Sequence, residues 1–277
     1  MQLYITSLNS GSNGNCYYIG NEQEAVLVDV GITCRETEKR MLRLGLSMAK
    51  VKAIFISHEH TDHISGVPVL AKKYNLPVYI TSGTRQNISL SWDNILVKSF
   101  QAYKPIQIGE LSVTGFPKFH DAADPHSFLV DYQDIKVGIF TDIGTPCDHV
   151  IRHFAQCHAA FLETNYDEDL LEQGYYPQQL KRRIRGDKGH LSNKQALDLF
   201  RAYKPAFMSH ILLSHLSKDN NNPKLVKELF SIHADQTEVI VASRFEETPV
   251  YKVTNTGEVK REVPVKVNKK GQYTLLF

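Results

Sequence analysis

The 277-residue sequence lacks several features that define other classes of protein. It contains no run of eighteen apolar residues, and its amino terminus, MQLYITSLNSGSNGN, has no basic start followed by an apolar run. We therefore expect neither a membrane-spanning segment nor export. The four cysteines have no CxxC spacing, which favours reduced thiols and a cytoplasmic location over a disulfide framework. The formal net charge of +2 is too small to indicate a nucleic-acid partner by itself.

The residues that are present indicate a globular α/β protein. A composition of 42% hydrophobic and 22% charged residues allows a substantial core, and strand and helix patterns alternate as in a layered αβ/βα fold. We expect strands at 3–7, 16–19, 25–29, 51–57, 78–81, 111–119, 136–140, 158–163, 206–215 and 238–242, and a hairpin-like tail at 250–276. Helices are expected at 35–44, 64–74, 82–90, 194–203 and 223–230. Residues 1–277 are interpreted as one domain with two halves, roughly 1–105 and 106–277.

The stretch IFISHEHTDH, residues 54–63, is the most informative part of the chain. A buried strand runs into a loop on which His58 and His60 can bind one metal ion, while Asp62 and His63 can turn toward a second. A helix cap needs one Ser, Thr, Asp or Asn and does not explain three histidines. The pattern His-x-His-x-Asp-His resembles the metallo-β-lactamase superfamily, which implies a four-layer sandwich of two mixed sheets with outer helices. His63 resembles the two-metal hydrolases of that superfamily more than the β-lactamases themselves.

Three further ligands are expected at the ends of later strands. We favour His120 over His126, because His126 begins the following strand. Asp142 in TDIG could simply form a turn, but with a metal cluster in the same sequence a carboxylate that bridges two ions is favoured. His215 closes the apolar run ILLS, whereas His210 lies inside that strand and is expected to pack there.

Two divalent ions, roughly 3.5 to 4 Å apart, can share a hydroxide and polarise a substrate oxygen. We assign His58, His60 and His120 to one ion. Asp62, His63 and His215 are assigned to the other ion, and Asp142 is assigned as the residue that bridges the two. Asp62 is also expected to orient the bridging hydroxide, which is the nucleophile. Zinc, manganese and iron all suit such a mixture of nitrogen and oxygen ligands.

Glu163 and His190 are the residues that favour phosphodiesters over other substrates. An alkoxide that leaves a phosphodiester benefits from a positioned acid, whereas a thioester or lactone needs little help. GHLSN and LSHLS stand in the order found in the tRNA-maturing ribonucleases of this fold. That resemblance implies that His190 contacts the phosphate and protonates the leaving oxygen, and that Glu163 holds its ring. The alternatives are that His190 only caps a helix and that Glu163 is a surface carboxylate. Asp29 is expected to support the metal loop from behind.

The segment before His190 is basic and supplies candidate substrate contacts. Arg182, Arg183 and Arg185 can contact phosphates, and Tyr176 can stack on a base. Ser192, in the same His-x-Ser unit, is assigned to the substrate as well, although it or Asn193 can also cap the next helix. A solvated helix face would explain the charges equally well. The loop of residues 10–15, rich in Gly, Ser and Asn, fits either an anion site or a simple hairpin turn.

Taken together, the motifs resemble the YycJ/WalJ branch of the metallo-β-lactamase superfamily. They are SLNSGSNGNCYYI, HEHTDHISG, HDAADPHSF, TDIG, LETNYD, GHLSN and SHLSKDNN. The resemblance implies a metal-dependent phosphodiesterase that acts on nucleic acid, DNA in preference to RNA, as a 5′-to-3′ exonuclease. The segment between Asp142 and His215 is too short for the additional β-CASP domain of other nucleases. Two alternatives stay open: a small-molecule hydrolase that cleaves a cyclic phosphodiester, or less favourably a thioester or lactone, and a regulatory binding module with a structural metal site.

Overall fold

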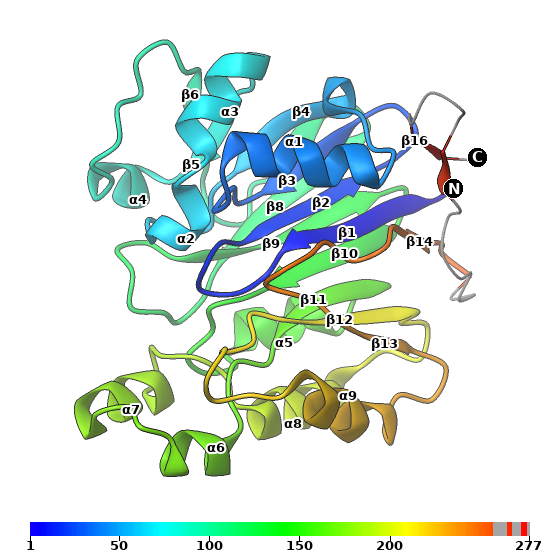
Figure 1. Cartoon of the computed structure of the whole chain (residues 1–277). Coiled ribbons are helices and arrows are strands. Elements are labelled where there is room, and N and C mark those ends of the chain that lie inside the picture. Colours follow the sequence, from blue (N-terminus) through cyan, green and yellow to red (C-terminus); the bar gives the residue numbers. More distant parts are fainter. Residues whose placement is uncertain (257–264, 268–272, 276–277) are drawn as a thin grey trace.

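The computed structural model describes residues 1–256, 265–267 and 273–275. Two seven-stranded mixed sheets pack face to face, and helices cover both outer sides (Figure 1). This is the four-layer αβ/βα sandwich that the sequence predicts. None of the helices in the described ranges is long and apolar enough to cross a membrane.

The first sheet is built mainly from the amino-terminal part of the chain. In spatial order its strands are β14 (Tyr251–Val253), β1 (Leu3–Asn9), β2 (Cys16–Gly20), β3 (Ala25–Val28), β4 (Val51–Phe55), β5 (Val78–Ile80) and β6 (Val97–Ser99). The second sheet contains β7 (Ile106–Ile108), β8 (Leu111–Pro117), β9 (His126–Tyr132), β10 (Ile135–Phe140), β11 (Ala159–Glu163), β12 (His210–Ser214) and β13 (Glu238–Val241). A separate pair consists of β15 (Val265–Val267) and β16 (Tyr273–Leu275).

Both sheets have the same internal plan. In each sheet the first three strand pairings are antiparallel and the last three are parallel, counting from β14 and from β7. The second sheet begins at Ile106, at the start of the expected second half, but β14 returns from the carboxyl-terminal part to complete the first sheet. Strands β3 and β10 therefore occupy equivalent places in the two sheets.

The helices form the two outer layers (Figure 1). Over the first sheet lie α1 (Cys34–Arg43), α2 (Thr61–Ile64), α3 (Val67–Tyr74) and α4 (Ser82–Gln86), with a 3-10 helix at Met48–Lys50. On the other side are α5 (Asp148–Phe154), α8 (Asn193–Tyr203) and α9 (Pro223–Ser231), while α6 (Glu168–Gln173) and α7 (Gln178–Arg185) lie beyond one end of the second sheet.

Three hydrophobic clusters hold the layers together. One lies between the sheets and includes Phe55, which stacks on Tyr79 and meets Phe128 edge-on. The other two lie between each sheet and its helices. Trp92 packs at the margin of the cluster under α1 and α3, as expected. Because both faces of the central strands are buried, strands such as β3 (AVLV) and β12 (HILLS) are mostly apolar, and polar side chains follow at their ends.

Several element boundaries differ from the sequence prediction. The helix expected at 64–74 begins later in the structure: α3 starts at Val67, and Ser65 and Gly66 separate it from Ile64, the last residue of α2. A Cβ at Gly66 would lie 1.9 Å from Ile32 O. Pro68 sits in the first turn of α3, a position that tolerates proline, so it is not the cause of the break. Helix α4 ends at Gln86 rather than at residue 90, and strand β12 begins at His210 rather than at residue 206.

The expected hairpin-like tail is only partly correct. Tyr251–Val253 pairs with β1 instead of within the tail, whereas β15 and β16 do pair with each other in antiparallel fashion. The rest of the predicted tail, at 257–264, 268–272 and 276, lies outside the described residues. The helices α5, α6 and α7 were not predicted; two of them shape one side of the site described next.

Candidate active site

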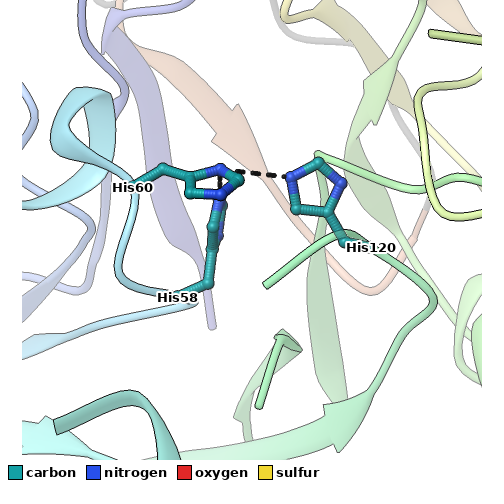
Figure 2. Close-up of side chains that lie close together, drawn as sticks. All are labelled: His58, His60 and His120. Carbon is teal, nitrogen blue, oxygen red and sulfur yellow. Dashed lines mark hydrogen bonds between the residues drawn. The ribbon is translucent and has the colours of Figure 1, made fainter. Parts of the chain in front are cut away.

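Three histidines from both halves of the chain meet at the mouth between the sheets (Figure 2). His58 and His60 follow β4, and His120 follows β8. His58 Nε2 lies 3.1 Å from His60 Nδ1, which lies 3.4 Å from His120 Nε2. Nitrogen ligands about 2.1 Å from a tetrahedral ion are roughly 3.4 Å apart. These two separations are close to that value, and all three ring nitrogens lie within 4.8 Å of one another, as binding to a single metal ion requires.

A second group lies beside the first and consists of Asp62, His63 and His215. Asp62 Oδ2 is 3.5 Å from Nε2 of both His63 and His215. Asp142 lies between the two groups: its oxygens are 3.2 Å from His63 Nε2, 3.4 Å from His215 Nε2 and 3.9 Å from His120 Nε2. The structure thus brings together all seven predicted ligands.

Two atoms of this cluster are buried without a hydrogen-bond partner among the described residues: Asp142 Oδ2 and His215 Nε2. Buried polar atoms without a partner are rare in folded proteins and each one costs free energy. Divalent cations would satisfy both atoms, and the mixed nitrogen and oxygen donors suit zinc, manganese or iron. The residues present fit a site for divalent metal ions.

The other ring nitrogen of four histidines is held by the surrounding structure. In the loop after β4, Nδ1 of His58 is 2.8 Å from Ser57 Oγ, and Nδ1 of His63 is 2.7 Å from Asp29 Oδ2. In the second half of the chain, Nδ1 of His120 is 3.0 Å from Gly189 O, and Nδ1 of His215 is 3.1 Å from Glu163 Oε1. Such contacts fix the orientation and tautomer of metal-binding histidines. Asp29 also accepts hydrogen bonds from the backbone and hydroxyl of Ser57, so it lies behind the metal loop as the sequence suggested.

Charge is distributed unevenly in the cluster. Burial lowers the pKa of His120 to about 4 and holds the pKa of His58 well below its usual range, so both rings are neutral, as metal binding requires. Burial acts in the same direction on His215, but Asp142, Asp62 and Glu163 outweigh it and raise its pKa to about 10. The carboxylates therefore attract positive charge to this end of the cluster.

Glu163 and His190 form a pair beside the second group. His190 Nδ1 lies 2.7 Å from Glu163 Oε1, and its ring stacks on that of His215 with centroids 5.3 Å apart. Glu163 Oε2 accepts from the backbone N–H groups of Ile143, at 2.6 Å, and Leu191, at 3.3 Å. Desolvation opposes ionisation of this fully buried carboxyl, but His190 lowers its pKa to about 2. The sequence alternative of a surface carboxylate is therefore wrong.

His190 is the exposed member of the pair, with 22% of its side chain accessible. Since Glu163 occupies Nδ1, Nε2 is the ring nitrogen available to a ligand. Both residues also lie within reach of the second metal group, together with Asp142 and His215. The oxygens of Glu163, however, already accept from two rings and two backbone groups, which favours a supporting role over metal ligation.

An open pocket of about 210 Å³ lies in front of His190 and His215. Arg183 and Tyr176, both predicted to contact substrate, line it. Arg183 Nε is 2.6 Å from Asp121 Oδ2, and the Tyr176 hydroxyl donates to Asp219 Oδ2 at 3.0 Å. These contacts attach the segment with α6 and α7 to the loops on either side of the pocket.

The other three residues that were expected to bind substrate do not line this pocket. Arg182 and Arg185 are exposed on α7 but do not line the pocket, and Arg185 pairs with Glu172. Ser192 is fully buried: its hydroxyl accepts from Gln195 N, donates to Glu168 and forms a capping box that starts α8. The assignment of Ser192 to substrate binding is therefore corrected to helix capping. Since Ser192 caps α8, the alternative that His190 is the cap is also wrong.

The competing histidines fall outside the cluster. His126 begins β9, hydrogen-bonds to Asp124 O at 2.9 Å and meets Phe100 edge-on. His210 is buried in β12 and its Nδ1 lies 2.8 Å from Ser209 Oγ. The preference for His120 and His215 agrees with this geometry.

Sequence reasoning missed two residues that contact the cluster, Asn15 and Asn165, and a buried lysine whose charge acts on it, Lys118. The Asn15 amide lies 3.2 Å from Asp62 Oδ2 and 3.1 Å from His63 Nε2. Asn165 donates to His215 O at 2.9 Å, and the buried Lys118 donates to Thr141 O at 2.7 Å. The polar loop at 10–15 was a usable signal for Asn15, whereas nothing near Lys118 distinguishes it from a surface lysine. The loop at 10–15 therefore contributes a side chain to the site and is more than a hairpin turn.

The fold and the site define a member of a known superfamily of metal-dependent hydrolases. A family model described as Metallo-beta-lactamase superfamily matches residues 10–173. Among solved structures, the metallo-beta-lactamase fold protein YhfI from Bacillus subtilis superposes with a TM-score of 0.70 at 17% identity, covering 91% of this chain and 100% of that one. Human tRNase Z, short form, gives 0.62 at 16% identity, over 88% and 98%. At these identities the two structures establish the fold alone.

Sequence relatives narrow the assignment. Exodeoxyribonuclease YycJ of Bacillus anthracis is 34% identical over 230 residues, which are 82% of this chain and 87% of the relative. Exodeoxyribonuclease WalJ of Streptococcus pneumoniae is 32% identical over 227 residues, 80% and 83% of the two chains. The chain belongs to the YycJ/WalJ family of the metallo-β-lactamase superfamily.

Proposed function

We propose that this protein is a phosphodiesterase with two divalent metal ions that degrades DNA as a 5′-to-3′ exonuclease. The observation that carries the proposal is the Glu163–His190 pair, 2.7 Å apart, at the edge of the metal cluster and facing an open pocket. A hydrolase of activated esters has no need of such an acid, whereas a phosphodiester with an alkoxide leaving group does. The names of the relatives YycJ and WalJ, both exodeoxyribonucleases, support DNA as the substrate.

In this proposal the first histidine group would hold one ion and Asp62, His63 and His215 would hold the other, and Asp142 could contribute to both sites. The bound ions would supply an ionised water at neutral pH and positive charge against the phosphate oxygens. Zinc, manganese and iron are the candidate metals.

The protein's own residues then act on protons and orientation. Asp62, which is partly exposed at the mouth, orients the attacking water. Glu163 accepts a hydrogen bond from Nδ1–H of His190 and so directs Nε2 to the substrate, where the imidazolium form carries a second proton. His190 donates that proton to the departing sugar oxygen. Arg183, Arg182 and Arg185 attract the backbone phosphates of the strand, and Tyr176 offers its ring at the pocket rim.

The protein is proposed to work as a soluble enzyme of the cytoplasm. All four cysteines are free, and three of them are buried, which fits a reducing compartment.

The test is an assay of purified protein with Mn²⁺ or Zn²⁺ on end-labelled duplex DNA, single-stranded DNA, RNA and a cyclic dinucleotide. We expect release of mononucleotides from DNA and a loss of about 100-fold in kcat for His190→Ala. His233→Ala is the matched control, because His233 belongs to none of the candidate metal-binding groups. Activity confined to the cyclic dinucleotide would replace the proposal by a small-molecule phosphodiesterase, and thioester hydrolysis indifferent to His190→Ala would exclude both.

A further inference from the structure

A second cavity, of about 340 Å³, lies directly behind the wall of the catalytic pocket. Ser217 lines both spaces, so the loop that follows the metal ligand His215 is their common partition. Ser10 lines the second cavity, and its hydroxyl accepts from His215 N at 2.7 Å. The cavity is therefore a neighbour of the metal cluster and not an isolated surface feature.

The lining of this cavity combines an apolar floor with cationic groups. The floor is formed by Leu216, Pro223, Val241 and Ala242. Arg244 and Lys218 supply positive charge at the walls, and Glu246 is the acidic residue of the lining. A volume of a few hundred cubic ångströms with an apolar surface and a few polar groups is typical of small-ligand sites.

Arg244 gives a specific indication of a ligand. Its Nη1 is buried and makes no hydrogen bond with any described residue. A guanidinium nitrogen removed from water without an acceptor is unfavourable, since the charged group loses its hydration. Arg244 also lines the cavity, so an oxyanion bound there would offset the charge of the guanidinium, and arginine is well suited to phosphate.

Phe245 adds an aromatic ring to the lining of this cavity. Its side chain is 74% exposed, yet its backbone is fixed: Phe245 N donates to Ser243 Oγ at 3.0 Å, and Phe245 O accepts from Arg40 Nη2 at 3.0 Å. Asn13 Nδ2 donates to Arg244 O at 2.8 Å, so the loop is also attached to the segment beside the metal site. An exposed aromatic ring on a well-anchored loop is a suitable surface for stacking a base.

We propose that this cavity is a nucleotide subsite, which binds one nucleotide unit next to the scissile phosphate, with its phosphate on Arg244 and its base against Phe245. The inference rests on the proposed nuclease function and deepens it. It divides substrate recognition between two surfaces: the pocket at Arg183 and Tyr176 on one side of His215, and the Arg244 cavity on the other.

The test compares Arg244→Gln and Phe245→Ala with two matched controls on exposed surface, Arg201→Gln and Ile232→Ala. On end-labelled DNA we expect KM to rise roughly 5- to 50-fold in each test variant with kcat nearly unchanged, because stacking and phosphate contacts contribute to binding. Hydrolysis of bis(p-nitrophenyl) phosphate, which is too small to reach both sites, is expected to stay at the wild-type rate and shows that the variants fold and hold metal.

A competition arm identifies the source of the nucleotide. Inhibition by free deoxyadenosine monophosphate that Arg244→Gln abolishes would assign the cavity to released mononucleotide, whereas a KM effect on DNA without such competition assigns it to a unit of the strand. If DNA is degraded and both test variants match their controls in both arms, the subsite is refuted while the nuclease function stands. If wild-type protein leaves DNA intact but cleaves the small ester, the nuclease proposal itself fails.

Discussion

Replacing Glu163 by glutamine tests the proposed acid most directly, because the substitution keeps the shape of the side chain and removes only its charge and two lone pairs. The carboxylate accepts from His190 and His215 through Oε1, and from Ile143 N and Leu191 N through Oε2. A glutamine amide can accept at one end only. Its NH₂ group must therefore face either the two rings or the two backbone donors, and in both orientations donors confront each other.

The magnitude follows from the contact that is lost. A hydrogen bond to a charged group contributes about 1.5 to 3 kcal/mol, so weakening the His190 contact is expected to lower kcat on DNA by roughly 10- to 150-fold. The reason is that His190 loses the acceptor that holds its Nδ1–H, so that fewer molecules direct Nε2 toward the leaving oxygen. Glu228→Gln on the exposed face of α9 is the control.

The assay uses two substrates with different leaving groups: end-labelled DNA and the p-nitrophenyl ester of thymidine monophosphate. Nitrophenolate departs without a proton, so Glu163→Gln and His190→Ala should slow DNA cleavage far more than cleavage of the nitrophenyl ester. Metal content is measured on the same samples, since Glu163 also holds His215. Equal losses on both substrates with full metal content would refute the role of the pair in protonating the leaving group.

Three further predictions concern the metals and the stability of the fold. Removing the metals with EDTA should lower the Tm by about 5 to 15 °C in calorimetry, because ions present at about 1,000 times their Kd stabilise the native state by about 4 kcal/mol. Gly31→Ala should release metal measured by atomic absorption, since an added Cβ would lie 1.7 Å from Asp62 O and displace the ligand loop. Gly45→Ala, just after α1 at a φ of 70°, strains its own backbone but should retain metal. Burial lowers the pKa of His210 to about 4, so as the pH falls from 6.5 to 4 the unfolded chain binds a proton before the folded protein does. The free energy of unfolding of the wild type should therefore fall by about 3 kcal/mol over that range. His210→Phe should remove this part of the pH dependence, as measured by urea unfolding. An unchanged slope would show that His210 does not titrate in this way.

The sequence predicted the layered fold and the convergence of the ligands because both depend on local patterns. Apolar runs mark strands that are buried on both faces, and a polar residue directly after such a run lies at a sheet edge. His58, His120, Asp142 and His215 all lie within three residues of a strand end, so their meeting required only that the strand ends share one mouth. The supporting role of Asp29 was instead an expectation from the resemblance to the metallo-β-lactamase fold.

What could not be predicted depends on contacts between distant segments. The burial of Lys118 and the second acceptor role of Glu163 arise from the packing of the second sheet, which leaves no periodic trace in the sequence. Ser192 was misassigned because a serine before a helix serves equally well as a cap and as a phosphate contact, and only its burial decides between them. Strand β14 pairs with β1 from the far end of the chain, and no local pattern indicates which sheet it joins.

The matching plan of the two sheets explains how one histidine comes to lie between two aspartates. Asp29 follows β3 and Asp142 follows β10, the strands that occupy equivalent places, and both residues have left-handed backbones with φ of 58° and 55°. That conformation is unfavourable for a residue other than glycine, by about 1 to 3 kcal/mol, and it turns each carboxylate back toward the mouth. Asp29 reaches His63 Nδ1 at 2.7 Å, whereas Asp142 reaches His63 Nε2 at 3.2 Å. One structural position thus places a carboxylate against each ring nitrogen of His63. In the proposed metal site, Asp29 would orient this histidine and Asp142 would be a ligand, and a metal ion would be held by Nε2 of His63, because Nδ1 contacts Asp29.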